Sequence, residues 1–178
     1  MTNEMQTQQA IWTIGHSTRS LTELIDLLVE NRVETLIDVR SFPGSRKYPH
    51  FNKERLNKTI PSAGVEYVHL SDLGGRRKTN KDSPNTTWRN LSFRSYADHM
   101  ETTNFEQGIY RLEEIAASSR VCYMCSEAVW WRCHRSMISD YLASRAWRVL
   151  HILGVGSTKG HTYTQPAKIV NGRLSYRP

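Results

Sequence analysis

The chain has 178 residues, 38% of them hydrophobic, and this length suits one domain that buries its own core. Its 24 lysines and arginines outnumber 17 aspartates and glutamates, and the net charge of +7 favours nucleic acid or a phosphorylated small molecule as partner. No apolar run approaches the roughly 20 residues that span a bilayer. Three cysteines without a secretory leader indicate a reducing compartment. We therefore expect a cytoplasmic protein that does not enter membranes, with its oligomeric state left open.

Apolar periodicity predicts strands and helices that alternate along the chain. Polar residues 1–10 are predicted to form a disordered leader, and residues 11–178 a single domain. We predict strands over 11–14, 35–40, 66–70, 121–125 and 149–152, helices over 21–31, 52–60, 93–100, 105–116 and 133–146, and a hairpin within 163–176. This order favours an α/β fold with a mainly parallel sheet of about five strands, flanked by helices and closed by the C-terminal hairpin. The polar segment 71–90 is typical of a functional lid or a disordered loop.

Polar side chains gather at the carboxyl ends of the predicted strands. These residues are Gly15-His16-Ser17, Asp38-Val39-Arg40, His69 and Cys125-Ser126-Glu127. Because the carboxyl ends of parallel strands meet at one edge of a sheet, where open α/β folds bind ligands, we expect these residues to converge. Structural interpretations stand beside this one: Gly15 serves a tight turn, His16 is a hydrogen-bonded loop residue, and Asp38 and Arg40 form a structural ion pair with Arg46.

The segment from Cys125 to Arg135 is dense in reactive side chains and is open to three chemistries. In the first, Cys125 is a thiolate nucleophile whose pKa is lowered by a helix amino terminus and by Arg132 or Arg135. The spacing from Cys125 to Arg132 does not match the phosphate-cradling loop of tyrosine phosphatases. In the second, Cys125, Cys133 and His134 bind zinc or iron, although neighbouring Cys133 and His134 do not easily both reach one ion.

The third chemistry uses Glu127 as an acid or base. Arg132, His134 and Arg135, at the start of the predicted helix, would then hold a phosphate through side-chain donors and free backbone amides. Trp130-Trp131 would either stack on a nucleobase or plug the gap between loop and core. The basic stretches around Arg46 and over 76–78 fit a groove for a phosphate backbone, and a solvated surface explains them as well.

Several motifs in this order resemble a known family. They are Thr13–Arg19, Asp38–Arg46, Phe51-Asn52, Leu73–Gly75, Phe93–Asp98, Cys125–Glu127 and Cys133–Arg135. The combination resembles the family called domain of unknown function 488 (DUF488) over nearly all of residues 11–152. The resemblance implies a Rossmann-like α/β domain of bacterial and archaeal cytosol, and it makes motif positions such as Asn52 and Tyr96 candidate site residues. Val129-Trp130-Trp131 departs from the family pattern, which commonly has a proline before Cys-His-Arg.

Together these features predict an enzyme that hydrolyses or transfers a group on a nucleotide or nucleic acid, as DNA repair enzymes do. Cleavage of an N-glycosidic bond is one version. The predicted catalytic residues are Glu127, Asp38, His16 and Cys125, and the predicted substrate- or phosphate-binding residues are Ser17, Arg40, Arg46, Asn52, His69, Gly74, Gly75, Tyr96, Trp130, Arg132, His134 and Arg135. The alternatives are a non-catalytic nucleic-acid-binding module and a metal- or thiolate-dependent enzyme. No cofactor is expected, with zinc or iron at Cys125, Cys133 and His134 as the alternative. Dinucleotide chemistry is disfavoured, because no G-x-G-x-x-G pattern begins at Gly15.

Overall fold

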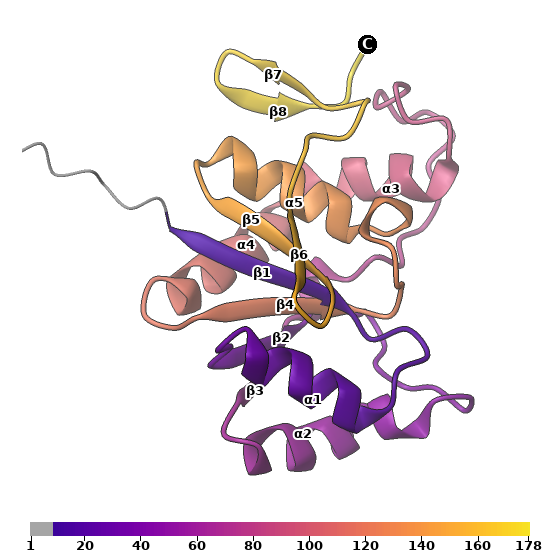
Figure 1. The fold of residues 1–178 in the computed structure, drawn as a ribbon. Helices are drawn as coiled ribbons and strands as arrows, with labels where there is room; N and C mark the ends of the chain where they lie inside the picture. Colours follow the sequence, from indigo (N-terminus) through magenta and orange to yellow (C-terminus); the bar gives the residue numbers. More distant parts are fainter. Residues whose placement is uncertain (1–8) are drawn as a thin grey trace, which may run out of the picture.

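The structure, a computed structural model, describes residues 9–178 and is built around a six-stranded sheet (Figure 1). The strands are β1 (Ala10–Gly15), β2 (Thr35–Asp38), β3 (Glu66–His69), β4 (Val121–Cys125), β5 (Arg148–Gly154) and β6 (Ser157–Gly160), in the spatial order β3-β2-β4-β1-β5-β6. All neighbours run parallel except β6, which is antiparallel to β5. Most of the predicted leader lies outside the described residues, and β1 already begins at Ala10.

Helices cover both faces of the sheet. α1 (Leu21–Glu30) and α2 (Lys53–Ser62) lie on one face, and α3 (Leu91–Met100), α4 (Thr103–Ala116) and α5 (Arg135–Ser144) lie on the other (Figure 1). Alternate side chains of each strand point to opposite faces, so two apolar cores form. Cys122 joins the core under α1 and α2, whereas Cys125 joins the core under α3 to α5. None of the helices in the described part of the chain is both long and apolar enough to cross a bilayer.

The predicted α/β fold with a mainly parallel sheet and a C-terminal hairpin is confirmed. The hairpin pairs β7 (Lys168–Val170) with β8 (Arg173–Ser175). Asn171 and Gly172 have φ values of 52° and 75° in its turn, the left-handed conformation that two-residue hairpin turns require. Strand β6 was not predicted, because Ser157–Gly160 is exposed along its whole length and shows no apolar alternation.

The position of β4 brings the site together. β4 lies between β2 and β1, and the register pairs Gly15 with Cys125 and Asp38 with Met124. Backbone bonds continue this pairing past the strand ends, since the His16 amide donates to the Cys125 carbonyl and the Ser17 amide to the Ser126 carbonyl, both at 2.9 Å. Three of the predicted polar strand ends are therefore direct neighbours.

The long segment 71–90 starts with the short 3₁₀ helix η2 (Ser71–Leu73) and then packs on α3. The buried Asn85 side chain donates to Asp98 at 2.8 Å and to Glu101 at 3.2 Å. The Thr87 hydroxyl donates to the carbonyl of Tyr176 at 2.6 Å, which ties the segment to the C-terminal region. These anchors hold the segment that contributes Gly75, Arg76 and Asn90 to a cleft at the sheet edge.

Candidate active site

A cleft of about 700 Å³ opens over the carboxyl ends of β1, β2 and β4. Of the predicted catalytic, binding and metal-site residues, those that line it are His16, Ser17, Arg40, Gly75, Tyr96, Cys125, Glu127, Arg132, Cys133 and His134. The other predicted site residues do not line it, namely Asp38, Arg46, Asn52, His69, Gly74, Trp130 and Arg135. Lining residues that were not among the predicted site residues include Ser41, Phe42, Tyr48, Arg76, Asn90 and Phe93. Arg76 had a signal in its basic stretch, whereas nothing local marked Asn90.

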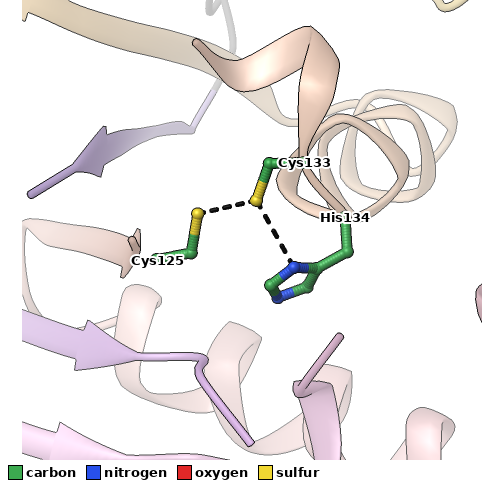
Figure 2. Close-up of side chains that lie close together, drawn as sticks. All are labelled: Cys125, Cys133 and His134. Atoms are coloured by element: carbon green, nitrogen blue, oxygen red, sulfur yellow. Dashed lines mark hydrogen bonds between the residues drawn. The ribbon is translucent and has the colours of Figure 1, made fainter. Parts of the chain in front are cut away.

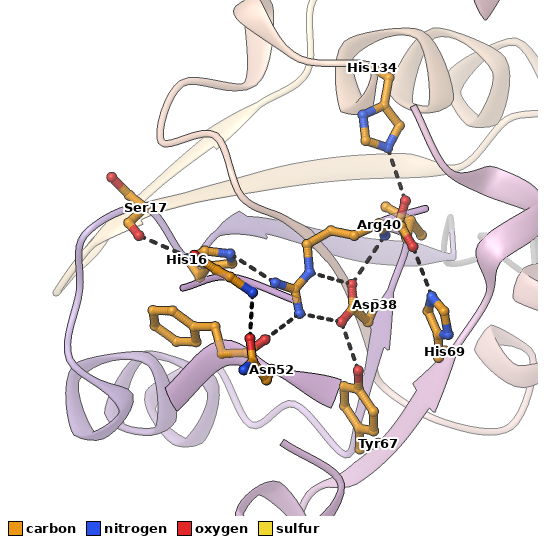
Figure 3. Close-up of polar contacts among 11 residues, drawn as sticks. His16, Ser17, Asp38, Arg40, Asn52, Tyr67, His69 and His134 are labelled. Atoms are coloured by element: carbon orange, nitrogen blue, oxygen red, sulfur yellow. Dashed lines mark hydrogen bonds and ion pairs between the residues drawn. The ribbon is translucent and has the colours of Figure 1, made fainter. Parts of the chain in front are cut away.

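Beneath the cleft floor, Asp38 is fully buried and its carboxylate is saturated with donors (Figure 3). Arg40 holds it in a bidentate pair, with Nε at 2.8 Å from Oδ1 and Nη2 at 2.6 Å from Oδ2. The Tyr67 hydroxyl donates to Oδ2 at 2.7 Å. The expected ion pair of Asp38 and Arg40 with Arg46 is therefore corrected: Arg40 alone is the partner, and Arg46 is exposed. Buried in this network, Asp38 positions Arg40 and has no surface on the cleft.

His16 is a second support for Arg40. Its Nε2 lies 3.2 Å from Arg40 Nη1, its Nδ1 lies 3.0 Å from the Ser17 carbonyl, and its ring stacks on Phe51 at 4.1 Å (Figure 3). Because a guanidinium only donates, Nε2 accepts and Nδ1 carries the hydrogen. Burial, assisted by the charge of Arg40, lowers the pKa of His16 to about 4. The ring is therefore neutral at pH 7 with both nitrogens engaged, which suits a positioning residue better than the predicted proton carrier.

Other predicted residues shape the loops around the cleft. His69 Nε2 lies 2.8 Å from the Arg40 carbonyl, and Asn52 accepts the Ser45 amide, which closes the loop after β2. Gly75 is required by close packing, since a Cβ there would lie 2.5 Å from His134 Nδ1. Gly15 is more constrained still: a Cβ would lie 1.7 Å from the Glu127 carbonyl, so only glycine lets the loop after β4 cross the end of β1.

Trp130 packs into the protein interior beside the cleft. It belongs to the 3₁₀ helix η3 (Trp130–Arg132), is buried, and stacks on His151 at 4.2 Å with nearly parallel rings. It faces a neighbouring hollow together with Trp88 and Trp131. Of the two interpretations weighed for the tryptophan pair, the structure favours the plug for Trp130, whereas Trp131 is 53% exposed.

Cys125, Cys133 and His134 form a compact cluster at the cleft floor (Figure 2). The two sulfurs are 2.6 Å apart, and Cys133 Sγ lies 3.4 Å from His134 Nδ1. His134 Nε2 lies 3.1 Å from the Val39 carbonyl, so it carries the hydrogen and leaves Nδ1 as an acceptor. The expectation that neighbouring Cys133 and His134 do not easily reach one ion is corrected, because the donor atoms of all three residues lie within 4.8 Å of one another.

The backbone conformation at the start of α5 explains why Cys133 and His134 point to the same place. Cys133 has extended backbone angles and His134 has helical ones, so the chain turns between them and both side chains face the same way. These three residues are the group in the described part of the chain that could hold a metal ion. The sulfurs are, however, closer than two sulfur ligands of tetrahedral zinc, which lie roughly 3.7 Å apart with bonds of about 2.3 Å.

Arg135 is the buried cation beneath this cluster. It is 1% exposed and donates from Nε to Cys125 Sγ at 3.0 Å, from Nη1 to Thr13 Oγ1 at 3.2 Å and from Nη2 to the Glu127 carbonyl at 2.6 Å. Within residues 9–178, no carboxylate forms an ion pair with it. Its burial leaves it no surface for the predicted phosphate contact.

The two thiols differ in acidity. Burial and the neighbouring Cys133 raise the pKa of Cys125 well above its usual value. Burial also opposes ionisation of Cys133, but the hydrogen bond from Cys125 and the charge of Arg135 outweigh it and lower the pKa of Cys133 to about 7. Because the thiols share one hydrogen bond, the pair loses its first proton near neutral pH. The structure thus indicates Cys133, and not the predicted Cys125, as the more acidic thiol.

Comparison with known proteins adds the family. The family model for the domain of unknown function DUF488 matches residues 20–142, well over half of the chain. The match spans the strand ends after β2 and β4 and the start of α5, which carry most of the cleft floor. No curated protein and no solved structure matches the chain. The chain therefore belongs to the DUF488 family.

Proposed function

We propose that this protein is an enzyme that acts on a nucleotide or nucleic acid in the cleft, by hydrolysis or group transfer. The observation that supports this most directly is the state of Glu127. Its exposed carboxylate lines the cleft, and no hydrogen bond or ion pair engages it among the described residues. Arg40, Arg76 and Arg132 line the same cleft. Three guanidinium groups and one free carboxylate that line the same cleft suit a phosphorylated substrate whose reacting centre needs an acid or a base.

The groups around the cleft would divide the work. Arg40, held by Asp38 and His16, is a rigid donor for a phosphate, whereas Arg76 and Arg132 are exposed and adjust to the substrate. In the N-glycosidic version, Glu127 stabilises the oxocarbenium-like sugar or protonates the leaving base.

A nucleobase also needs a flat apolar surface, and two phenylalanines line the cleft. Phe42 is largely exposed and Phe93 is half-buried. Stacking of a base on an aromatic ring contributes about 1 to 3 kcal/mol in single-strand binders. Phe42 and Phe93 therefore take the role that the sequence analysis considered for Trp130.

The experiment combines binding and turnover. Binding is followed by fluorescence anisotropy of a labelled single-stranded DNA and by calorimetry with AMP. Turnover is followed by chromatography of every product formed from these compounds, including free base, nucleoside and shortened DNA. Glu127→Gln is expected to lower turnover about 10² to 10⁴-fold with binding retained, because the amide cannot transfer the proton. Arg132→Gln should weaken binding at least about tenfold, because a charge-assisted hydrogen bond is lost.

The control is Arg111→Gln on α4, which removes the same charge from an exposed ion pair with Glu114 that does not line the cleft. It should leave binding and turnover unchanged. Binding that depends on Arg132 without any turnover in the wild-type protein would instead identify a nucleic-acid-binding module. Equal binding by all the variants would contradict the proposed site.

A further inference from the structure

Arg135 is a buried positive charge that has no role in the proposed function. A buried guanidinium without a counter-ion is strongly destabilised, so an anion is expected beside it. Its neighbours are two backbone carbonyls, the Thr13 hydroxyl and the Cys125 sulfur, and a second sulfur lies 2.6 Å beyond. Of these groups only the thiols ionise. The groups available to balance the charge of Arg135 are therefore the thiols of Cys125 and Cys133.

We propose that Cys133 and Cys125 form a redox-active dithiol at the cleft floor, which a small hydroperoxide oxidises reversibly to a disulfide. Cys133 is the attacking sulfur, because it is 5% exposed against 1% for Cys125 and its hydrogen bond to His134 Nδ1 offers an acceptor for the thiol proton. Both sulfurs line the cleft, which gives an oxidant of the size of hydrogen peroxide its path. The proposal adds a reaction to the proposed function and does not depend on it.

The chemistry balances with one peroxide for each dithiol. The Cys133 thiolate attacks one peroxide oxygen, the O–O bond breaks, and the departing hydroxide takes up a proton to form water. The resulting sulfenic acid is attacked by the Cys125 sulfur, an S–S bond forms, and the hydroxyl leaves as a second water with the Cys125 proton. Two thiols are thus oxidised to one disulfide while hydrogen peroxide is reduced to two waters.

The arginine also makes the disulfide easy to reverse. Oxidation removes the thiolate and leaves the buried charge of Arg135 without its counter-ion, so the surroundings favour the reduced form. A disulfide whose reduced form is stabilised in this way is a comparatively strong oxidant and reacts readily with a soluble thiol such as glutathione. This distinguishes the pair from a permanent structural crosslink.

A bound metal is the competing occupant of these sulfurs. The positive charge of Arg135, whose Nε lies 3.0 Å from Cys125 Sγ, opposes a divalent cation at this position. Metal binding and disulfide formation exclude each other, because a metal bound by both thiolates would protect them from oxidation.

The test uses the full-length protein, reduced and then treated with one equivalent of hydrogen peroxide. Mass spectrometry of the intact protein should show the loss of two hydrogens. After alkylation of the remaining thiol, trypsin should yield the peptide Val121–Arg132 linked to Cys133-His134-Arg135. Glutathione should restore the original mass. Cys122 shares the first peptide, so Cys122→Ala is the matched control and should still form the disulfide.

Two variants assign the roles. In Cys125→Ser, dimedone should trap a sulfenic acid on Cys133, because the resolving thiol is missing. In Cys133→Ser, neither the disulfide nor the sulfenic acid should form. Failure of the wild-type protein to form the linked peptide would overturn the proposal without reference to any variant's folding. A link through Cys122, or one equivalent of zinc that persists through purification and blocks oxidation, would also overturn it. None of these results bears on release of base by Glu127.

Discussion

Two arginines are buried at the same edge of the sheet, and their charges are balanced in different ways. Arg40 lies against the carboxylate of Asp38 in a bidentate pair, and the Tyr67 hydroxyl completes the network. Arg135 lies against Cys125, whose partner Cys133 carries the acidic proton of the pair. The first arrangement is a bidentate ion pair and suits a rigid support, whereas the second depends on pH and redox state. The same buried cation can therefore serve architecture or reactivity, according to its counter-ion.

The largest expected effect tests the ion pair of Asp38 and Arg40. Asp38→Asn leaves the Arg40 charge buried without its carboxylate, and we expect the free energy of unfolding at pH 7 to fall by about 3 to 5 kcal/mol. Urea denaturation measures it. Glu114→Gln removes the carboxylate of an exposed arginine pair and should cost less than about 1 kcal/mol. Similar losses for both variants would show that burial of the Arg40 pair has no special cost.

A second prediction concerns acid sensitivity on the Arg40 side. The folded pKa of His16 is about 4 against 6.5 in the unfolded chain, so between these values the unfolded state binds more protons and stability falls as the pH is lowered. Between pH 7 and pH 5 this costs about 2 kcal/mol. His16→Gln should lose about 2 kcal/mol less than the wild-type protein over that interval, measured by urea titrations at each pH. An equal loss in both proteins would mean that Arg40 and burial do not hold the ring neutral.

The sequence predicted one of these regions better than the other. Strand ends such as Gly15-His16-Ser17 and Asp38-Val39-Arg40 stand out locally, because short apolar runs stop at polar residues, and parallel strands then bring those ends together. The spacing of Asp38 and Arg40 also places both on one side of the chain, so their contact could be predicted from the sequence. The predicted partner Arg46 was wrong, because it is near in sequence but exposed. The further contact to Asp38 comes from Tyr67, 29 residues later in the chain.

The burial of Arg135 could not be predicted in this way. Arginine is rarely fully buried, so at a helix start beside cysteines it was interpreted as a ligand-binding residue. Its burial depends on β4 lying between β1 and β2, and on Gly15 allowing the Glu127 carbonyl to cross the end of β1. Both are long-range features that no local spacing encodes. The same holds for the turn at Cys133 that brings its sulfur to Cys125.

The smallest expected effect tests the pairing of Arg135 with the two thiols directly. The pKa of Cys133 is about 7 in the folded protein, against an ordinary value of 9.0. Its thiolate therefore contributes its full stabilisation above pH 9.0, and this stabilisation is lost as the pH falls through 7. Between pH 6 and pH 8, under reducing conditions, the wild-type protein should gain about 1 kcal/mol relative to Cys133→Ser. Urea titrations at the two pH values give this difference.

Cys122→Ala is the control for that measurement. Burial raises the pKa of Cys122, so its thiol stays neutral over this interval and its removal should leave the pH dependence of the wild-type protein unchanged. A gain that persists in Cys133→Ser would assign the pH dependence to other groups, and Arg135 would then need a counter-ion that is independent of pH. A gain that is lost only with Cys133 would instead show that the counter-ion of Arg135 is a titrating thiol, in contrast to the carboxylate of Asp38 beside Arg40.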